Sequence, residues 1–269
     1  MIEREILERF AGFSALYDRS RPKPPEILTK LVLDLLKKDK VKRVIDLGCG
    51  TGLSTFIWSA VADQIIGIEP NSELRQIAEQ KAKRGAYTNV SFKCADSYKT
   101  NESKSSVDIV TCSQSFHWME PVSTLKEVNR ILKSDGAFVA YDCDWPPTVA
   151  FEAENAYFSL VSRVNEILKR HRGGKRGLKR WDKSKHLENI RKSGYFRYTK
   201  EILLHHREQG NAERFINLVL SRGSIQDLLK RGVAKEELRL TEFVRDVKKS
   251  ISDKKVPIYF SYRVRVGIK

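Results

Sequence analysis

No apolar run in the 269-residue sequence approaches the roughly 18–20 residues that a membrane-spanning helix needs. The first ten residues, MIEREILERF, also lack the basic end and the apolar block of a secretory signal. These two absences predict a cytoplasmic protein with no membrane partner.

The sequence contains only four cysteines, and they stand far apart: Cys49, Cys94, Cys112 and Cys143. No Cys-x-x-Cys pair occurs, and the nearest histidine, His117, has no second pair with which to complete a zinc site. This spacing excludes a disulfide framework and predicts reduced thiols, most of them buried. We expect no bound metal.

Acidic residues are too few to balance the basic ones, and the excess is confined to one part of the chain. With 50 Lys and Arg against 34 Asp and Glu, the formal charge is +16. Residues 1–145 hold 21 basic and 20 acidic side chains, so nearly all of the excess follows residue 145. Positive charge on this scale invites a nucleic-acid interpretation, which the motifs must test.

Apolar periodicity in the first part of the chain predicts strands that alternate with helices. Short apolar runs predict strands at 41–47, 64–69, 90–94, 107–112 and 137–141. Helical spacing predicts helices at 26–38, 53–62, 72–84 and 122–132, the last closed by a turn at 134–136. This alternation is typical of an α/β fold, with a parallel sheet covered by helices on both faces.

The rhythm changes after Asp144, where Pro146 and Pro147 interrupt the chain. The later residues predict helices at 151–170 and 185–193, and two or three more within 211–249, broken at Gly223 and Gly232. Strands are expected at 195–205 and, from a clean alternation of apolar residues, at 256–268.

The most informative segment is VIDLGCGTG, from Val44 to Gly52, in which a strand runs into closely spaced glycines. It differs from a nicotinamide-binding turn, because Leu53 stands where that pattern needs glycine. Asp46 precedes the first glycine, and an anion there opposes a pyrophosphate but suits a ligand that carries an amino group. A helix is expected to follow and to present its free N–H groups to the ligand.

Polar side chains follow each of the next three predicted strands. Glu69 ends the second strand and can accept hydrogen bonds from two ribose hydroxyls. Asp96 and Ser97 follow the third strand, where the carboxylate either accepts from an adenine amino group or caps a helix. Gln114 and Ser115 follow the fourth. Because carboxyl ends of parallel strands meet at one edge, these positions predict a single ligand site.

These motifs resemble the class I S-adenosylmethionine-dependent methyltransferases. VIDLGCGTG, IIGIEPN, CADS, VDIVTCSQSFHWME and LKEVNRILKSDGAFVAYD are similar to successive motifs of that family, over roughly residues 40–143. Gln114 to Trp118 resembles the trans-aconitate methyltransferase-like small-molecule subset. The resemblance implies S-adenosylmethionine as cofactor and S-adenosylhomocysteine as product.

The resemblance also implies a fold and a division of the chain. The expected architecture is a Rossmann-like, seven-stranded, mostly parallel sheet with an antiparallel last strand and helical lid insertions. Residues 1–145 would form N-terminal cap helices and the cofactor-binding core. Residues 146–255 would form a mostly helical lid and substrate region that includes a sixth core strand near 195–205. Residues 256–269 would form the final antiparallel strand.

The family's cofactor-binding residues map onto positions in this sequence. The resemblance places the methionine part of the cofactor at the glycine turn and the ribose at the end of the second strand. It places the adenine beside the ends of the second and third strands. Two N-terminal residues would fold over the cofactor. The implied set is Tyr17, Arg21, Asp46, Gly48, Cys49, Gly50, Glu69, Pro70, Asn71, Asp96, Ser97 and Gln114.

The acceptor side of the site is less defined. His117 is the best candidate for a general base, because a free histidine titrates near neutrality; the alternative is a residue that only shapes the pocket. Ser115, Trp118 and Trp145 are predicted to line the substrate pocket. A carboxylate acceptor would need no base, whereas a hydroxyl or amine acceptor would need one.

A basic stretch at 169–185 leaves three interpretations open. It is a solvated loop, a surface that attracts an anionic substrate, or a nucleic-acid contact. The [DNS]-P-P-[YFW] motif for methylating base amino groups is absent after the fourth strand, where SQSFHW stands. We therefore expect methylation of a small molecule, at oxygen, with an anionic acceptor as one hypothesis. A tRNA or nucleic-acid methyltransferase, or a non-catalytic cofactor-binding protein, is the alternative, and the oligomeric state stays open.

Overall fold

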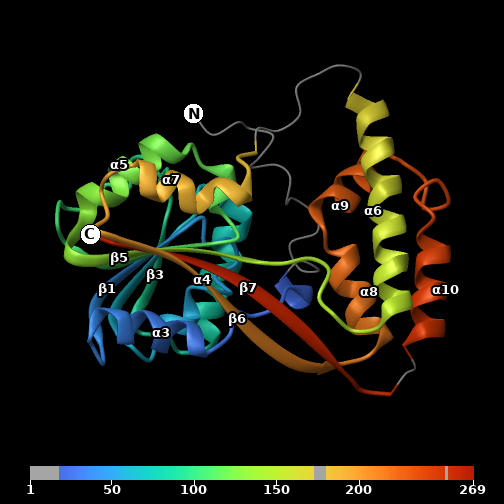
Figure 1. Ribbon diagram of the computed structural model, residues 1–269, viewed down its shortest axis with the longest axis horizontal. Coiled ribbons are helices and arrows are strands. Elements are labelled where there is room, and N and C mark those ends of the chain that lie inside the picture. The colour runs from blue at the N-terminus through green and yellow to red at the C-terminus, as the bar shows by residue number, and fades with distance from the viewer. Residues whose placement is uncertain (1–17, 173–179, 252–253) are drawn as a thin grey trace.

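The computed structural model describes residues 18–172, 180–251 and 254–269, and in these ranges a seven-stranded sheet forms the centre of the molecule (Figure 1). The strands lie in the order β3-β2-β1-β4-β5-β7-β6. Every strand is parallel to β1 except β7, which pairs antiparallel with β5 and with β6. Their bounds are β1 Val41–Leu47, β2 Ala62–Ile68, β3 Val90–Lys93, β4 Val107–Ser113, β5 Leu132–Cys143, β6 Tyr198–Gly210 and β7 Val256–Ile268.

The strand order places a crevice beside β1. Strand β1 pairs with β2 on one side and with β4 on the other. The strand order therefore continues through β2 and β3 in one direction and through β4 and β5 in the opposite direction. Open α/β sheets bind ligands at such a point, outside the carboxyl ends of the strands. The predicted Rossmann-like sheet with an antiparallel last strand is therefore confirmed.

Two apolar layers cover the sheet. One contains α3 Ile27–Leu36, together with Trp58 and the inward side chains of β7. The other contains α5 Pro121–Ile131 and residue Ile190 of α7 His186–Lys192. The remaining core helix, α4 Ser72–Arg84, packs beside β3, and Asn71 caps it by accepting a hydrogen bond from the Leu74 N–H at 3.0 Å.

A second, helical unit stands at the far end of the long β6–β7 ribbon (Figure 1). We call it the helical bundle; it consists of α6 Phe151–Arg172, α8 Ala212–Leu220, α9 Gly223–Lys230 and α10 Leu240–Ser250. These helices share their own apolar core, and Trp145 packs against both this core and that of the sheet.

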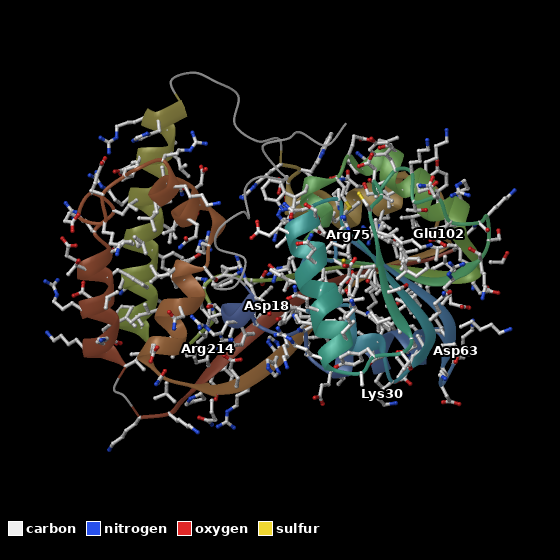
Figure 2. All side chains as sticks on the ribbon, turned by 180° about the vertical axis from the view of Figure 1, so that it is seen from behind. Asp18, Lys30, Asp63, Arg75, Glu102 and Arg214 are labelled. Carbon is white, nitrogen blue, oxygen red and sulfur yellow. The ribbon has the colours of Figure 1, made fainter. Side chains whose placement is uncertain are left out.

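The bundle is tied to the rest of the molecule by polar contacts. Arg214 of α8 donates a hydrogen bond to the carbonyl of Ser20 and pairs with Glu208 at 2.6 Å. Figure 2 shows Arg214 and Asp18 between the bundle and the sheet.

No helix in the described ranges combines the length and apolar character needed to cross a bilayer.

The helix predicted at 53–62 is wrong. Only a three-residue 3-10 helix, η1 Phe56–Trp58, forms there, within a series of turns. The Ser54 and Thr55 hydroxyls donate to the carboxylate of Asp46 at 2.8 and 2.7 Å, which ties the start of the segment to β1. No α-helix N-terminus therefore faces the ligand crevice at this turn.

Two strand bounds also differ from the prediction. Strand β5 begins at Leu132, directly after α5, and the expected closing turn at 134–136 lies inside the strand as a bulge against β4. Asp135 accordingly has a left-handed φ of 66°. Strand β6 runs about five residues past the predicted end, to Gly210, because β7 pairs with it along its whole length.

Candidate functional site

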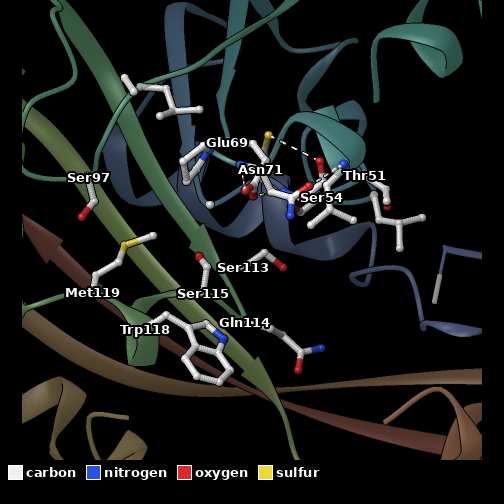
Figure 3. Close-up of a pocket in the computed structure, with 18 of the residues that line it drawn as sticks. Thr51, Ser54, Glu69, Asn71, Ser97, Ser113, Gln114, Ser115, Trp118 and Met119 are labelled. Carbon is white, nitrogen blue, oxygen red and sulfur yellow. Dashed lines mark hydrogen bonds between the residues drawn. The ribbon is translucent and has the colours of Figure 1, made fainter. Parts of the chain in front are cut away.

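A cavity of about 580 Å³ opens at the carboxyl ends of β1, β2 and β4 (Figure 3). Its described lining comes from residues 21–24, the glycine turn, the ends of β2, β3 and β4, and Trp181. The helical bundle contributes no described side chain to it. The predicted crevice is thus present at this edge of the sheet.

The glycine turn after β1 needs glycine for two different reasons. Gly48 and Gly50 have φ values of 66° and 56°, in the left-handed region that other residues avoid. A Cβ atom on Gly48 would lie 2.7 Å from the Cβ of Ser115, so the turn packs tightly against the end of β4. A Cβ atom on Gly50 would meet nothing within 4 Å, so this position leaves open space beside the cavity.

Asp46 supports the turn from below. The side chain is fully buried and accepts hydrogen bonds from the hydroxyls of Ser54, Thr55 and Thr111, at 2.7 to 2.8 Å. Burial raises the pKa of this carboxyl, although the three hydroxyls oppose the shift. Asp46 is absent from the described cavity lining, and its hydrogen bonds to three hydroxyls support the turn from the side of β1.

Glu69 faces the cavity from the end of β2. Its Oε2 accepts the Gly50 N–H and its Oε1 accepts the Asn71 N–H, each at 2.9 Å. Burial raises the pKa of this carboxyl, and the two N–H donors and Arg75 oppose that shift. A carboxylate oxygen can accept more than one hydrogen bond, so both oxygens of Glu69 keep capacity for ligand hydroxyls. The Glu69 carboxylate thus joins the glycine turn to the segment after β2.

Two residues after β4 close the opposite wall. The Ser115 hydroxyl donates to the Leu47 carbonyl at 2.7 Å, which joins the ends of β4 and β1. Gln114 has a φ of 50°, unusual for a residue with a side chain. The neighbouring structure maintains this conformation, since the Gln114 N–H donates to the Tyr141 carbonyl at 2.8 Å. Its side chain projects from the strand end into the cavity region (Figure 3).

The segment after β3 contributes a third wall. Ala95, Ser97 and Tyr98 line the cavity, and the Ser97 hydroxyl is hydrogen-bonded to Thr124 at 2.9 Å. Asp96 lies outside the lining, and a hydrogen bond from Tyr98 to its carboxylate raises the pKa of that phenol.

His117 lies behind the cavity wall. It belongs to the 3-10 helix η2 Phe116–Trp118 and is buried, and its Nδ1 is 3.8 Å from Oδ1 of Asp142. Asp142 also pairs with Lys183 at 2.5 Å and with Arg265 at 3.0 Å. His117 is absent from the described cavity lining, which favours a pocket-shaping role over that of a base.

Aromatic and basic residues gather at the mouth of the cavity. The ring of Trp118 lines it, and the guanidinium carbon of Arg180 lies 4.2 Å from the centre of that ring. Trp181 also lines the cavity, and its backbone N–H donates to the His117 carbonyl at 2.9 Å. The end of the basic stretch therefore reaches the cavity mouth.

Comparison with known proteins agrees with this geometry. Residues 45–140 match the family model described as a methyltransferase domain. The probable S-adenosylmethionine-dependent methyltransferase CRG1 of Saccharomyces cerevisiae is 32% identical over 152 residues, which cover 54% of this chain and 50% of CRG1. Residues 45–140 thus match a methyltransferase domain, and the chain is similar to an S-adenosylmethionine-dependent methyltransferase over about half of its length.

Relatives of the methyltransferase domain match over a limited length. The methyltransferase-like protein C25B8.10 of Schizosaccharomyces pombe is 26% identical over 173 residues, which cover 64% of this chain and 62% of that protein. The chain spans about half the length of the curated relatives it matches.

Solved structures extend the likeness of fold to nearly the whole chain. A type II methyltransferase candidate from Anaeromyxobacter dehalogenans has a TM-score of 0.65 at 17% identity, covering 92% of this chain and 97% of that one. Phosphoethanolamine N-methyltransferase 2 of Haemonchus contortus has a TM-score of 0.57 at 15% identity, covering 99% and 59%. That protein was solved with phosphomonomethylethanolamine and S-adenosylhomocysteine.

Most of the predicted methyltransferase site residues meet at the cavity, and several do not. Trp145 lies outside the lining, against Arg21, and Asp46, Asp96 and His117 stand behind the walls. Tyr17 and residues 173–179 of the basic stretch lie outside the described residues. The predicted residues that line the cavity are Arg21, Gly48, Cys49, Gly50, Glu69, Pro70, Asn71, Ser97, Gln114, Ser115 and Trp118.

Other lining residues were not anticipated from the sequence. Met119 and Ser113 stand next to predicted positions in the chain, so their neighbours were the available signal. Pro22 and Pro24 belong to the N-terminal segment that resembles the family. Trp181 had no such signal, because a backbone hydrogen bond to His117, far away in sequence, brings it to the mouth.

Proposed function

We propose that this protein is an S-adenosylmethionine-dependent methyltransferase that acts on a small molecule, at an oxygen atom. The observation that carries the proposal is the hydrogen bond between the glycine turn and Glu69, beside β1, where the strand order reverses direction. A cavity of about 580 Å³ is of the size that small-molecule sites occupy.

The residues present fit the cofactor. Both oxygens of Glu69 keep acceptor capacity for ribose hydroxyls, and Gly50 leaves space for the methionine part. Ala95 and Ser97 provide a wall for adenine, and Arg21 stands at the rim as a cation for a carboxylate. When bound, S-adenosylmethionine supplies an activated methyl group.

This chain contributes alignment and exclusion of water. Holding acceptor oxygen, methyl carbon and sulfur in line supplies most of the acceleration in such a displacement. A carboxylate acceptor needs no base, which agrees with a His117 that stands behind the wall. The aromatic mouth formed by Trp118 and Trp181 would exclude water from the reacting centre.

Glu69→Gln tests the cofactor site directly. The amide offers one acceptor in place of two, so it cannot serve both backbone N–H groups and the ribose hydroxyls. Hydrogen bonds to charged groups contribute about 1.5–3 kcal/mol, so we expect binding of S-adenosylhomocysteine to weaken about 10–100-fold in calorimetry.

Glu102→Gln is the matched control. Glu102 is also buried, but it pairs with Arg43 at 2.6 Å and with Lys93 at 2.9 Å, away from the cavity. This variant should lose stability and keep its affinity for S-adenosylhomocysteine. Equal affinities of wild type and Glu69→Gln would remove Glu69 from the site, and an absence of binding by the wild type would refute the function.

A further inference from the structure

A second arginine lies beside Arg21, on the bundle side of the cavity. Arg222 caps α9, and its guanidinium carbon lies 5.4 Å from the ring centre of Trp145. The guanidinium carbon of Arg21 lies 5.1 Å from the same ring. Arg21 also donates to the carbonyl of Ser221 at 3.5 Å, which joins the cavity rim to the corner between α8 and α9.

Arg222 is held without a counter-ion. It is half-buried, and no Asp or Glu in the described part of the chain pairs with it. The one described hydrogen bond of its side chain is donated by Nη1 to the Tyr157 hydroxyl at 2.6 Å, and its Nε is buried without an acceptor in the described part of the chain. Burial, with the nearby charge of Arg21, lowers the pKa of Arg222. Such an arrangement is costly unless an anion compensates it.

Tyr157 completes the cluster. Its ring lies 5.3 Å from the guanidinium carbon of Arg222, and it comes from α6 of the helical bundle. Its oxygen accepts from Arg222, so its own proton remains to be donated. Guanidinium and phenol groups that converge in this way match the donor pattern that a carboxylate or a phosphate requires.

We propose that Arg222 and Tyr157 bind an anionic carboxylate or phosphate group of the methyl acceptor. The inference rests on the proposed function, and it assigns the acceptor's anion to the junction between bundle and core. Arg21 lines the cofactor cavity and contacts the same tryptophan, so an acceptor anchored at Arg222 extends toward the cavity.

Anion binding in the presence of saturating S-adenosylhomocysteine tests this assignment. The probes are acetate, malonate and inorganic phosphate, each measured by thermal unfolding against potassium chloride of equal ionic strength. We expect saturable stabilisation of the wild type by malonate or phosphate. Arg222→Gln should weaken it at least about tenfold, since it removes a charge-assisted contact. Tyr157→Phe should weaken it less.

Arg245→Gln is the matched control, because Arg245 is an exposed bundle arginine that pairs with Asp246 at 2.9 Å. It should respond to anions as the wild type does. The carboxylate and phosphate arms show which anion the site takes, and either supports the proposal. If Arg222→Gln does not fold, the anion response of Tyr157→Phe decides: a weaker response than that of the wild type supports the proposal, and an equal response contradicts it.

Two results would overturn the inference alone: an equal anion response in wild type and both variants, or no saturable response in a wild type that binds S-adenosylhomocysteine. Failure to bind S-adenosylhomocysteine would instead refute the proposed function, so the two failures are distinguishable.

Discussion

Asp46 and Glu69 are both buried carboxylates near the glycine turn, and their partners separate their roles. Asp46 is surrounded by three side-chain hydroxyls below the turn, whereas Glu69 accepts two backbone N–H groups and still faces the cavity. From the sequence both were expected to touch the ligand. The difference arises because β1 buries Asp46 beneath the turn, while Glu69 stands at the open end of β2.

Gly50→Ala, compared with a control glycine, tests whether the open space beside the turn is needed for cofactor binding. The methyl group would enter open space next to the cavity, and the left-handed φ costs about 1–2 kcal/mol for an alanine. We expect lower stability and binding of S-adenosylhomocysteine that is about tenfold weaker or more in calorimetry. Gly232→Ala is the control, because Gly232 also has a left-handed φ and open space but lies in the turn after α9, outside the cavity lining. If both variants bind equally well, Gly50 does not contact the cofactor.

At the scale of elements, local signals are reliable where they are self-contained. Helix α4 begins and ends as predicted, because Asn71 caps it and its apolar face meets β3. The segment at 53–62 has the apolar content of a helix, yet it forms turns. Hydrogen bonds from Ser54 and Thr55 to Asp46 on β1 account for this, and no short-range pattern announces them.

The short helix α7 is expected to make stability depend on pH through His186. This histidine is buried against Phe116, with ring centres 4.8 Å apart, and burial lowers its pKa to about 4. In the unfolded chain a histidine has a pKa of about 6.5. Between these values only the unfolded chain takes up the proton, so stability falls as the pH falls from about 6.5 toward 4.

His186→Gln should remove this contribution. Urea unfolding between pH 7 and pH 4 should show a smaller loss of the free energy of unfolding in His186→Gln than in the wild type. His205→Gln, at an exposed position on β6, should leave the wild-type dependence unchanged. Parallel pH curves for wild type and His186→Gln would show that His186 is not the group that titrates.

At the scale of the whole molecule, the excess charge belongs to the later part of the chain. Residues 146–269 hold 29 basic and 14 acidic side chains and include the bundle, β6 and β7. The described cavity lining contains only three charged residues, Arg21, Glu69 and Glu120. The charge therefore bears on what approaches the molecule and says little about the reaction.

The charge distribution leads to a prediction about nucleic acid. Bulk tRNA should bind the protein weakly, and the affinity should fall steeply with salt, as expected for contacts to phosphates alone. Labelled S-adenosylmethionine should transfer no methyl group to that RNA at physiological salt, whereas a pool of small carboxylates should accept it. Transfer to RNA would contradict the small-molecule proposal and favour the nucleic-acid alternative.

The sequence by itself determined the class of the fold and the edge of the sheet at which the cavity opens. The signals that led to this prediction each lie within a short stretch of sequence, so they can be interpreted without the tertiary structure. They are the alternation of apolar runs, the turn at Gly48 and Gly50, and the carboxylate of Glu69. Tertiary structure alone decided which polar residues reach the cavity and which support it from behind. It also brought Arg222 to the same tryptophan as Arg21 and to the hydroxyl of Tyr157, although these residues are far apart in the sequence.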